Sequence, residues 1–342
     1  MKSPVWVLAG EAAGRAAAVS VELTGKARQL ADDLSADGLR SAEGGQVAAV
    51  LIAQGAEAAA AELIAAGADV VFLLEHPQLT HYHSSACARL LSEMVRKHQP
   101  QIVLAGATPL GADLAARLAA RLETGLTAHC LELSIEKIDG TAQLVQVVPG
   151  WGGNLALRIL CPQRRPQMAS VRPGVLERPQ PNPSRSGEVV RLTPEVNPDE
   201  LNPQVVEVVH HATAEMPLEE APAVVAGGWG LYCTGDTDSA QQLCSILGAC
   251  LAGTRPAVDK GMVGSDRMIG HSGKSVRPRL MVTLGASGAL HFTSGFLRSK
   301  VVLAVDRNPQ APIFEACDVG IVGDLQEVLP LLCEELTGAT GR

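Results

Sequence analysis

The sequence predicts two α/β domains, each built on a mainly parallel sheet, with an antiparallel extension on the first. In the first half, and again in the last third, short apolar runs alternate with helical stretches. Between these parts the pattern changes to closely spaced strands and then to a proline-rich segment. The chain has 342 residues, which is enough for two domains of ordinary size with a core each.

The first predicted domain covers residues 1–175. Apolar runs predict strands at residues 5–9, 47–53, 69–74 and 101–105, and helical periodicity predicts helices at residues 84–98 and 110–122. After Thr124 the pattern indicates strands at residues 130–138, 142–148, 155–161 and 167–172, with a hairpin at Asp139-Gly140. We interpret these later strands as the antiparallel extension.

A linker is predicted at residues 176–204. Six prolines stand among polar residues here, namely Pro179, Pro181, Pro183, Pro194, Pro198 and Pro203. Because so many prolines prevent a regular helix or a central strand, we expect this segment to be a connector. A short strand is predicted directly after it, at residues 205–210.

The second predicted domain covers residues 205–336 and leaves residues 337–342 as a tail. A strand ending in a glycine turn is predicted at residues 223–230 and a helix at residues 238–251. Buried strands are predicted at residues 280–284, 301–305 and 319–322, and a closing helix at residues 326–336.

Composition excludes several classes of function. Aromatic residues are only 3% of the chain and the formal net charge is −8, so we expect no nucleic-acid partner. The eight cysteines form no C-x-x-C pair, which favours reduced, buried thiols over a metal site, a disulfide framework or an iron–sulfur cluster. No segment has the pattern of a signal peptide or a membrane span, so we expect a cytoplasmic protein without membrane insertion.

Small and polar residues follow the strands of the second domain, where ligands bind in open parallel sheets. These positions are residues 227–230, 254–255, 269–274, 285–292, 305–308 and 323–325. Together they predict a nucleotide or dinucleotide site. A nucleophilic Ser287 is disfavoured because Ala289 breaks the G-x-S-x-G pattern of hydrolases, and the lysine signature of phosphate loops is absent.

Several stretches in a fixed order carry a resemblance to a known family. The first domain contains "GGNLALRILCPQRRPQMASVRPGV". The second contains "TRPAVDKGMV", "IGHSGK", "GASGAL" and "KVVLAVDRNPQAPIFEACDVGIVGDL". Over most of its length the sequence resembles the alpha subunits of electron transfer flavoproteins, a family that includes FixB.

The resemblance implies that the second domain is a Rossmann-like, DHS-like domain that binds FAD. It also implies a heterodimer with a beta subunit, which would meet the first domain. Such proteins relay electrons from a dehydrogenase, for example an acyl-CoA dehydrogenase of fatty acid β-oxidation, to an acceptor oxidoreductase, and convert no substrate of their own. The implied cofactor-binding residues are Trp229, Thr254, Arg255, Ile269, Gly270, His271, Ser272, Gly273, Ser287, Gly288, Ala289, Leu290, His291, Phe292, Asp306, Asp324 and Leu325.

The sequence departs from the family pattern at several of these positions. Trp229 replaces an arginine, and Asp306 replaces an asparagine, so we expect Asp306 to contact a ribose or an amine rather than a phosphate. His271 and Ser272 replace Gln and Thr, and the family's Gln-His pair becomes His291-Phe292.

Phenylalanine at position 292 cannot donate a hydrogen bond to the anionic edge of a one-electron-reduced flavin. We therefore expect either a shifted flavin potential and a divergent redox partner, or restoration of the contact by His271 or His291. The alternative function is a scaffold or binding subunit of the same complex whose flavin is altered or lost.

Overall fold

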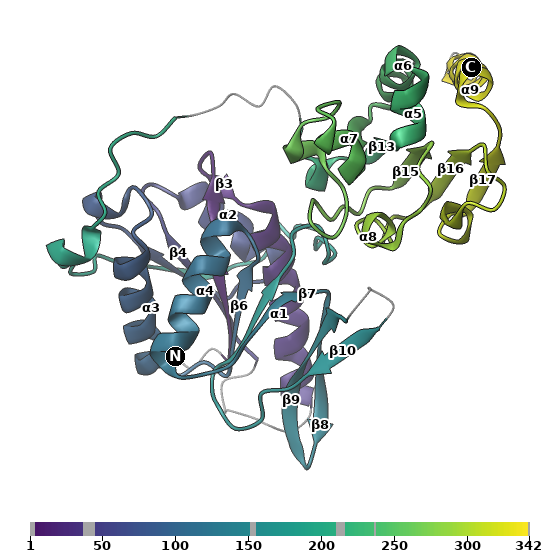
Figure 1. Ribbon diagram of the computed structural model, residues 1–342. Helices are drawn as coiled ribbons and strands as arrows, with labels where there is room; N and C mark the ends of the chain where they lie inside the picture. The colour runs from purple at the N-terminus through teal and green to yellow at the C-terminus, as the bar shows by residue number, and fades with distance from the viewer. Residues whose placement is uncertain (1–3, 37–44, 151–154, 210–215, 236, 341–342) are drawn as a thin grey trace. The chain divides into compact units, whose positions relative to one another are not determined.

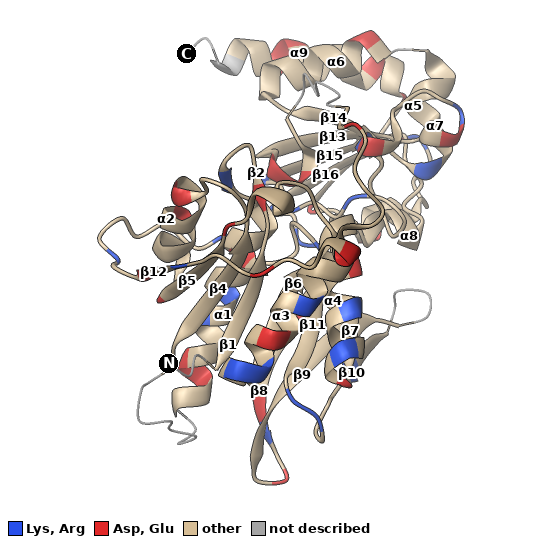
Figure 2. Ribbon diagram, turned by 90° about the vertical axis from the view of Figure 1, so that its left-hand side faces the viewer, with Lys and Arg blue, Asp and Glu red and all other residues tan. Residues whose placement is uncertain are grey.

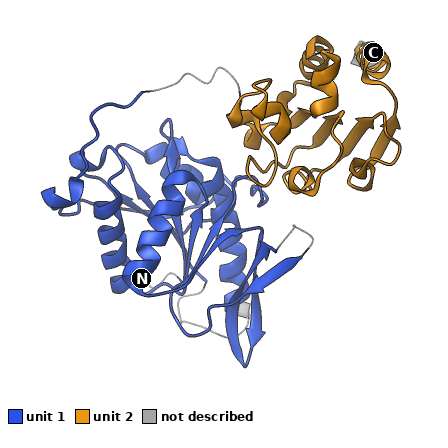
Figure 3. Ribbon diagram, in the orientation of Figure 1, with its two compact units in different colours: residues 1–150, 154–210 blue, residues 151–153, 211–342 orange. Residues whose placement is uncertain are grey.

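The computed structural model describes residues 4–36, 45–150, 155–209, 216–235 and 237–340 (Figure 1). Within them the chain forms two compact units, which Figure 3 colours separately. Unit 1 comprises the described residues up to 209, and unit 2 comprises the described residues from 216 onward.

Unit 1 contains a seven-stranded sheet in the order β12-β5-β4-β1-β6-β11-β7, and every pair of neighbours is parallel. Its strands are β1 (Val5–Ala9), β4 (Val47–Ile52), β5 (Val70–Leu74), β6 (Ile102–Gly106), β7 (Leu126–Cys130), β11 (Gln167–Val171) and β12 (Glu188–Leu192). The four strands predicted in the first half of this domain are confirmed to within one residue at each end.

Helices cover both faces of this sheet (Figure 1). The helices are α1 (Ala18–Ala36), α2 (Glu57–Ala66), α3 (Ser84–His98) and α4 (Pro109–Leu122). Alternate residues of β1 divide between two cores: Val5 and Val7 lie with residues of α1, and Trp6 and Leu8 lie with residues of α3 and α4. The helix α4 begins where predicted because the Thr108 hydroxyl accepts a hydrogen bond from the Gly111 N–H at 3.1 Å.

The antiparallel extension consists of β8 (Glu132–Ile138), β9 (Thr141–Pro149) and β10 (Ala156–Ile159), in the order β10-β9-β8. Two predictions for it were wrong. The strand β11 lies in the main sheet, parallel to both β6 and β7, and the predicted strand at 130–138 is divided between β7 and β8. All residues of β11 are buried, including the polar Gln167 and Ser170, as in a strand covered on both faces.

The predicted linker also contains regular structure. The strand β12 adds to the edge of the sheet beside β5, a position that tolerates nearby prolines. Farther along, Arg89 of α3 binds Glu200, with Nε and Oε2 2.7 Å apart, and donates to the Glu195 carbonyl. The segment up to Leu201 is therefore attached to unit 1. The strand predicted at residues 205–210 is wrong for residues 205–209, and residue 210 lies outside the described residues.

Unit 2 contains a five-stranded parallel sheet in the order β14-β13-β15-β16-β17. Its strands are β13 (Ala223–Gly227), β14 (Cys250–Gly253), β15 (Leu280–Leu284), β16 (Val302–Asp306) and β17 (Val319–Val322). The helices α6 (Thr237–Leu247) and α9 (Leu325–Thr340) cover one face, and α8 (Leu290–Thr293) lies on the other. The remaining short helices are α5 (Trp229–Thr234) and α7 (Arg255–Asp259).

Three details of unit 2 differ from the predictions. The helix predicted at 238–251 ends at Leu247, because Gly248 takes φ +59° and the chain then enters β14. The strand β17 is an edge strand, so Val319 and Val322 are exposed rather than buried. The helix α9 continues to Thr340, through most of the predicted tail.

A hairpin of β2 (Glu11–Ala12) and β3 (Arg15–Ala16) completes the strands of the described residues. Among their helices, none is both long enough and apolar enough to span a bilayer.

Candidate functional site

The sheet of unit 2 has a topological switch point between β13 and β15. From β13 the chain passes to β14 on one side, and β15 then pairs with β13 on the other side. Two turns leave the carboxyl ends of these strands and bond to each other. The Gly228 N–H donates to the Leu284 carbonyl at 2.8 Å, and the Gly230 N–H donates to the Gly285 carbonyl at 2.9 Å. Open α/β sheets bind their ligands outside such an edge.

The glycines of these turns are required by contacts within the chain. A Cβ on Gly228 would lie 2.3 Å from the Gly285 carbonyl oxygen. Gly288 has φ +87°, and its Cβ would lie 2.2 Å from the Ile313 nitrogen. At both glycines the absence of a Cβ therefore permits the close approach of two stretches of protein backbone.

A second pair of loops forms a ledge beside this switch point, made of residues 269–274 and the start of α8. The His271 N–H donates to the His291 carbonyl at 2.7 Å, and the two imidazole rings have centroids 5.6 Å apart. Both histidines are exposed. Gly270 permits this contact, because a Cβ there would lie 2.5 Å from the His291 oxygen.

One residue that holds this ledge, Glu219, was not predicted from the sequence. Glu219 precedes β13 and forms an ion pair with Lys274, with Oε1 and Nζ 2.5 Å apart. The two residues are separated by 55 positions, so only the folded chain shows that they meet.

Thr254 lies at the carboxyl end of β14 and is 8% exposed. Its N–H donates to the Gly227 carbonyl at 3.1 Å, which ties it to the end of β13. Its hydroxyl is buried and has no hydrogen-bond partner among the described residues. The neighbouring Arg255 is exposed, and its Nε lies 2.7 Å from Asp259 Oδ1.

The two aspartates at the other end of the edge hold their own turns. Asp306 ends β16, is 9% exposed, and accepts a hydrogen bond from the Asn308 N–H at 2.9 Å. Asp324 precedes α9 and accepts from the Gln326 N–H at 2.9 Å. Both carboxylates therefore have a local structural role beside any contact with a ligand.

The structure brings the predicted site residues to one edge but turns three side chains inward. Ile269, Phe292 and Leu325 are buried in the cores of unit 2. Phe292 packs edge-on against Phe296, with ring centroids 5.0 Å apart. These three residues can present only their backbone to a ligand, whereas Ser272, Ser287 and Ala289 are exposed on the edge.

The carboxyl edge differs in charge from the face that α6 and α9 cover. Figure 2 shows acidic residues on α6 and α9, and neither of these helices contains a Lys or Arg. The loops of the edge contain Arg255, Lys274 and Arg307 together with His271 and His291. Arg255 and Lys274 are ion-paired with Asp259 and Glu219, and Asp306 and Asp324 lie on the same edge, so the edge carries charges of both signs.

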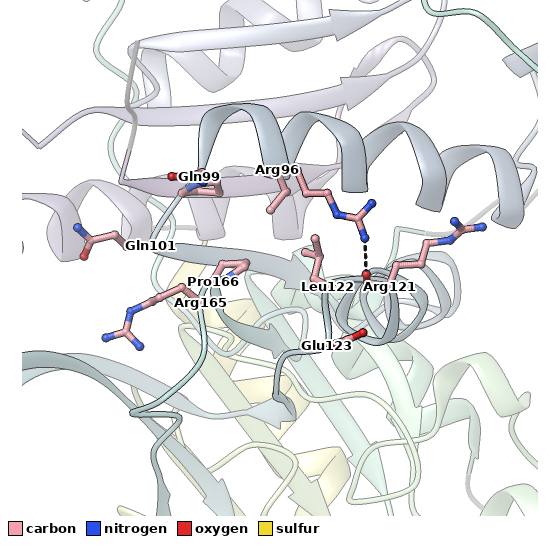
Figure 4. Close-up of a pocket in the computed structure, with 10 residues that line it drawn as sticks. Arg96, Gln99, Gln101, Arg121, Leu122, Glu123, Arg165 and Pro166 are labelled. Carbon is pink, nitrogen blue, oxygen red and sulfur yellow. Dashed lines mark hydrogen bonds between the residues drawn. The ribbon is translucent and has the colours of Figure 1, made fainter.

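A pocket of 510 Å³ on unit 1 is a weaker candidate, although three arginines line it (Figure 4). Arg96 donates from Nη2 to the Arg121 carbonyl at 2.7 Å, which caps the end of α4. Figure 4 shows the guanidinium groups of Arg121 and Arg165 pointing in different directions, away from a common centre. The three cations therefore do not converge on one anion.

The fold and the edge define a class: a two-unit α/β protein whose second sheet carries a dinucleotide site. Comparison with known proteins identifies the family. Residues 5–197 match the family model of the electron transfer flavoprotein domain, and residues 217–297 match that of the electron transfer flavoprotein FAD-binding domain.

The electron transfer flavoprotein subunit alpha of Thermoanaerobacterium thermosaccharolyticum is 38% identical over 332 residues, which is 97% of this chain and 97% of the relative. The subunit alpha of Megasphaera elsdenii is 35% identical over 98% of this chain and 97% of its own length. The FixB protein of Azorhizobium caulinodans is 36% identical over 96% of this chain and 87% of its own length. The chain belongs to the electron transfer flavoprotein alpha-subunit family.

FAD is the cofactor of this family's second domain, and the residues of the edge fit it. The buried Thr254 hydroxyl lacks a partner within the described chain, and buried polar groups are nearly always hydrogen-bonded. A cofactor with phosphates, hydroxyls and ring nitrogens along its length supplies such partners. The family match to the FAD-binding domain includes Thr254, His271 and Ser287, and it ends before Asp306.

Proposed function

We propose that this chain is the FAD-carrying subunit of a heterodimer that relays electrons from a dehydrogenase to an acceptor oxidoreductase. The observation that carries the proposal is the carboxyl edge of unit 2, where a switch point, two exposed histidines and a Thr254 hydroxyl without a partner among the described residues coincide.

The residues of the edge have separate roles in this proposal. When bound, FAD supplies the chemistry by accepting and releasing electrons. Thr254 donates or accepts a hydrogen bond, and His271 and His291 supply imidazole groups to the anionic part of the cofactor. Arg255 adds positive charge at the rim beside Asp259. Asp306 and Asp324 hold the turns after β16 and before α9.

The proposed partner is an electron transfer flavoprotein beta subunit, and β10 is its proposed docking strand. Among the described strands, β10 pairs with β9 alone. Alternate apolar residues of β10 and of the position before it are exposed: Leu155 by 62%, Leu157 by 49% and Ile159 by 37%. An exposed apolar row on an open edge is typical of a protein interface.

A charge placed on this row tests the docking surface. Leu157→Glu should abolish co-purification with the beta subunit, because binding would bury an unpaired carboxylate. Val189→Glu is a matched control, since Val189 is 38% exposed on β12, an edge strand of the seven-stranded sheet of unit 1. Equal loss of the heterodimer in both variants would contradict docking at β10.

The names of two relatives support an electron-transfer role beside a dehydrogenase or a reductase. One relative, from Acetobacterium woodii, is a subunit of a lactate dehydrogenase that uses NAD⁺ and ferredoxin, and it is 36% identical over 94% of this chain. Another, from Anaerotignum propionicum, is an electron transfer subunit of an acryloyl-CoA reductase. We propose a donor of the acyl-CoA dehydrogenase type, as in fatty acid β-oxidation, with a separate acceptor oxidoreductase.

The function is tested on the heterodimer with its beta subunit. We expect the purified complex to show the visible absorption of FAD. The absorption should fall when a dehydrogenase and its substrate are added, and it should return when an acceptor is added. A complex that takes up no FAD, even with the cofactor in excess, would contradict the proposal and favour the scaffold function suggested by Trp229 and Phe292.

A further inference from the structure

The first described segment of unit 2 is fastened to one loop of the carboxyl edge, residues 268–274, at two points. The Met216 carbonyl accepts a hydrogen bond from Arg267 Nη1 at 2.9 Å, and Glu219 forms its ion pair with Lys274. These contacts join residues that are 51 and 55 positions apart in the chain. Because Arg267 precedes the loop and Lys274 ends it, the segment holds the loop at both ends.

Glu219 is itself held firmly on its side of the ion pair. It lies in the 3-10 turn η4 (Leu218–Glu220), and its neighbour Leu218 is 2% exposed in the core that also contains Ile269. The Glu219 side chain is only 15% exposed, whereas the Lys274 side chain is 42% exposed. An ion pair with one shielded partner is stronger than a pair in open solvent. Glu219 is therefore the fixed partner, and Lys274 is the residue that it holds.

The loop is closed on itself by backbone hydrogen bonds. The Lys274 N–H donates to the Met268 carbonyl at 2.7 Å, and the Gly270 N–H donates to the Lys274 carbonyl at 3.1 Å. A Cβ on Gly273 would lie 2.4 Å from the Met268 oxygen, so the turn has no room to tighten further. Lys274 and His271 therefore belong to one hydrogen-bonded turn, and a displacement of Lys274 displaces His271 with it.

We propose that Glu219 is a positioning residue for the contact between His271 and the flavin, and that it acts through Lys274. This inference rests on the proposed function and deepens it, because it names a residue outside the cofactor contacts that sets their geometry. The His271 imidazole is exposed, so its place at the edge depends on the loop that carries it. A displacement of about 1 Å is enough to weaken a positioned contact of this kind.

The first measurement is amide hydrogen exchange in the heterodimer without cofactor. Glu219→Asp keeps the charge but shortens the side chain by one methylene group, whereas Glu219→Gln keeps the length and an oxygen acceptor. We expect the His271 N–H to exchange about tenfold faster in the Asp variant and at nearly the wild-type rate in the Gln variant. The opposite order would show that charge acts rather than reach, and it would overturn the inference.

The second measurement is a titration of FAD into the same heterodimers. Glu219→Asp should raise the dissociation constant for FAD by about threefold to tenfold, because a misplaced imidazole binds less well. In a chain that also carries His271→Ala, Glu219→Asp should have no further effect, since residues that act through one another are not additive. Fully additive effects of the two substitutions would overturn the inference.

Glu200→Asp is the matched control. Glu200 has a similarly shielded side chain, 18% exposed, and binds Arg89 in unit 1, 111 positions away. This variant should leave FAD affinity and the exchange of the His271 N–H unchanged, and an equal loss of affinity would contradict the positioning role of Glu219. Failure of the wild-type heterodimer to bind FAD would instead contradict the proposed function, while the exchange measurement, which needs no cofactor, would still test the hold of Glu219 on the loop.

Discussion

His271 and His291 come from two loops and lie side by side, with ring centroids 5.6 Å apart and a 2.7 Å hydrogen bond between their backbones. Both rings are exposed at the carboxyl edge, whereas the neighbouring Phe292 is buried against Phe296. At position 292 this chain has phenylalanine where the family has histidine, and the Phe292 side chain is part of the core. The imidazoles on the edge are those of His271 and His291.

We predict that this pair stabilises the reduced flavin. A hydrogen bond to a charged group contributes about 1.5–3 kcal/mol. Changing both histidines to alanine should therefore lower the first one-electron potential of the bound FAD by about 60–130 mV, since 59 mV is tenfold for one electron. A spectroelectrochemical titration of the heterodimer measures this shift.

Phe292→His serves as the comparison for that experiment. Its ring would enter the core of unit 2 rather than the edge, so we expect a less stable chain and no rise in the potential. If the first one-electron potential of the variant with both histidines changed to alanine equals that of the wild type, neither imidazole contacts the flavin.

Thr254 and Thr283 allow a matched test of the cofactor contact. Both hydroxyls are buried without a hydrogen-bond partner in the described chain, but Thr254 lies at the edge and Thr283 lies within β15. Each change to valine should stabilise the cofactor-free chain by about 1 kcal/mol, because it removes an unsatisfied buried group. Only Thr254→Val should weaken FAD binding, by about tenfold. Urea unfolding with and without FAD separates the two effects.

Substitutions at Gly288 and Gly261 distinguish two costs of adding a Cβ: a clash with neighbouring backbone, and the strain of a left-handed backbone conformation. Both have positive φ, at +87° and +69°. A Cβ on Gly288 would meet the Ile313 backbone, whereas a Cβ on Gly261 would meet nothing within 4 Å. Gly261→Ala should cost about 1–2 kcal/mol of stability from the left-handed conformation alone. Gly288→Ala should cost about 3 kcal/mol or more, because backbone cannot yield as a side chain can. Equal thermal destabilisation would contradict the packing role.

Much of the fold could be predicted from local patterns. The strands of the parallel sheets are short apolar runs between helices, and the bounds of β1, β15 and β17 match the prediction. Several errors concern strand pairing, because pairing partners are distant in sequence. Residues 167–171 were predicted as a strand but assigned to the antiparallel extension, and residues 188–192 were predicted as linker. Their neighbours in the sheet, β6 and β5, are not visible in a local window.

The site was predicted as a set of loops, and the structure shows the direction of each side chain. Nothing in the sequence distinguishes the inward Phe292 from the outward His291, because α8 has only four residues and gives no clear periodicity. The orphaned hydroxyl of Thr254 also depends on what surrounds it in space. The motif order could therefore identify the family, while the roles of single residues required the fold.

The hydrogen bond from Tyr82 to Asp113, 2.7 Å long, predicts how the stability of unit 1 depends on pH. Burial, and then the bond to Asp113, raise the pKa of Tyr82 above its ordinary value near 10. The bond from Tyr82 lowers the pKa of Asp113 below its ordinary value near 3.8. The neutral phenol and the charged carboxylate are thus the forms that the folded chain favours.

We therefore expect Tyr82→Phe to reduce the free energy of unfolding by about 0.5–1 kcal/mol near pH 7, a small effect because solvent screens the partly exposed Asp113. The raised pKa of Tyr82 means that this contribution is lost as the pH rises above about 10, since the unfolded chain ionises first. The lowered pKa of Asp113 means that it is also lost as the pH falls below about 4, since the unfolded chain then binds the proton first. Urea unfolding at a series of pH values measures the difference in free energy of unfolding between the wild-type and Tyr82→Phe chains. This difference should be largest between about pH 4 and pH 10 and smaller outside that range. A difference that stays constant at every pH would show that the phenol contributes by packing alone.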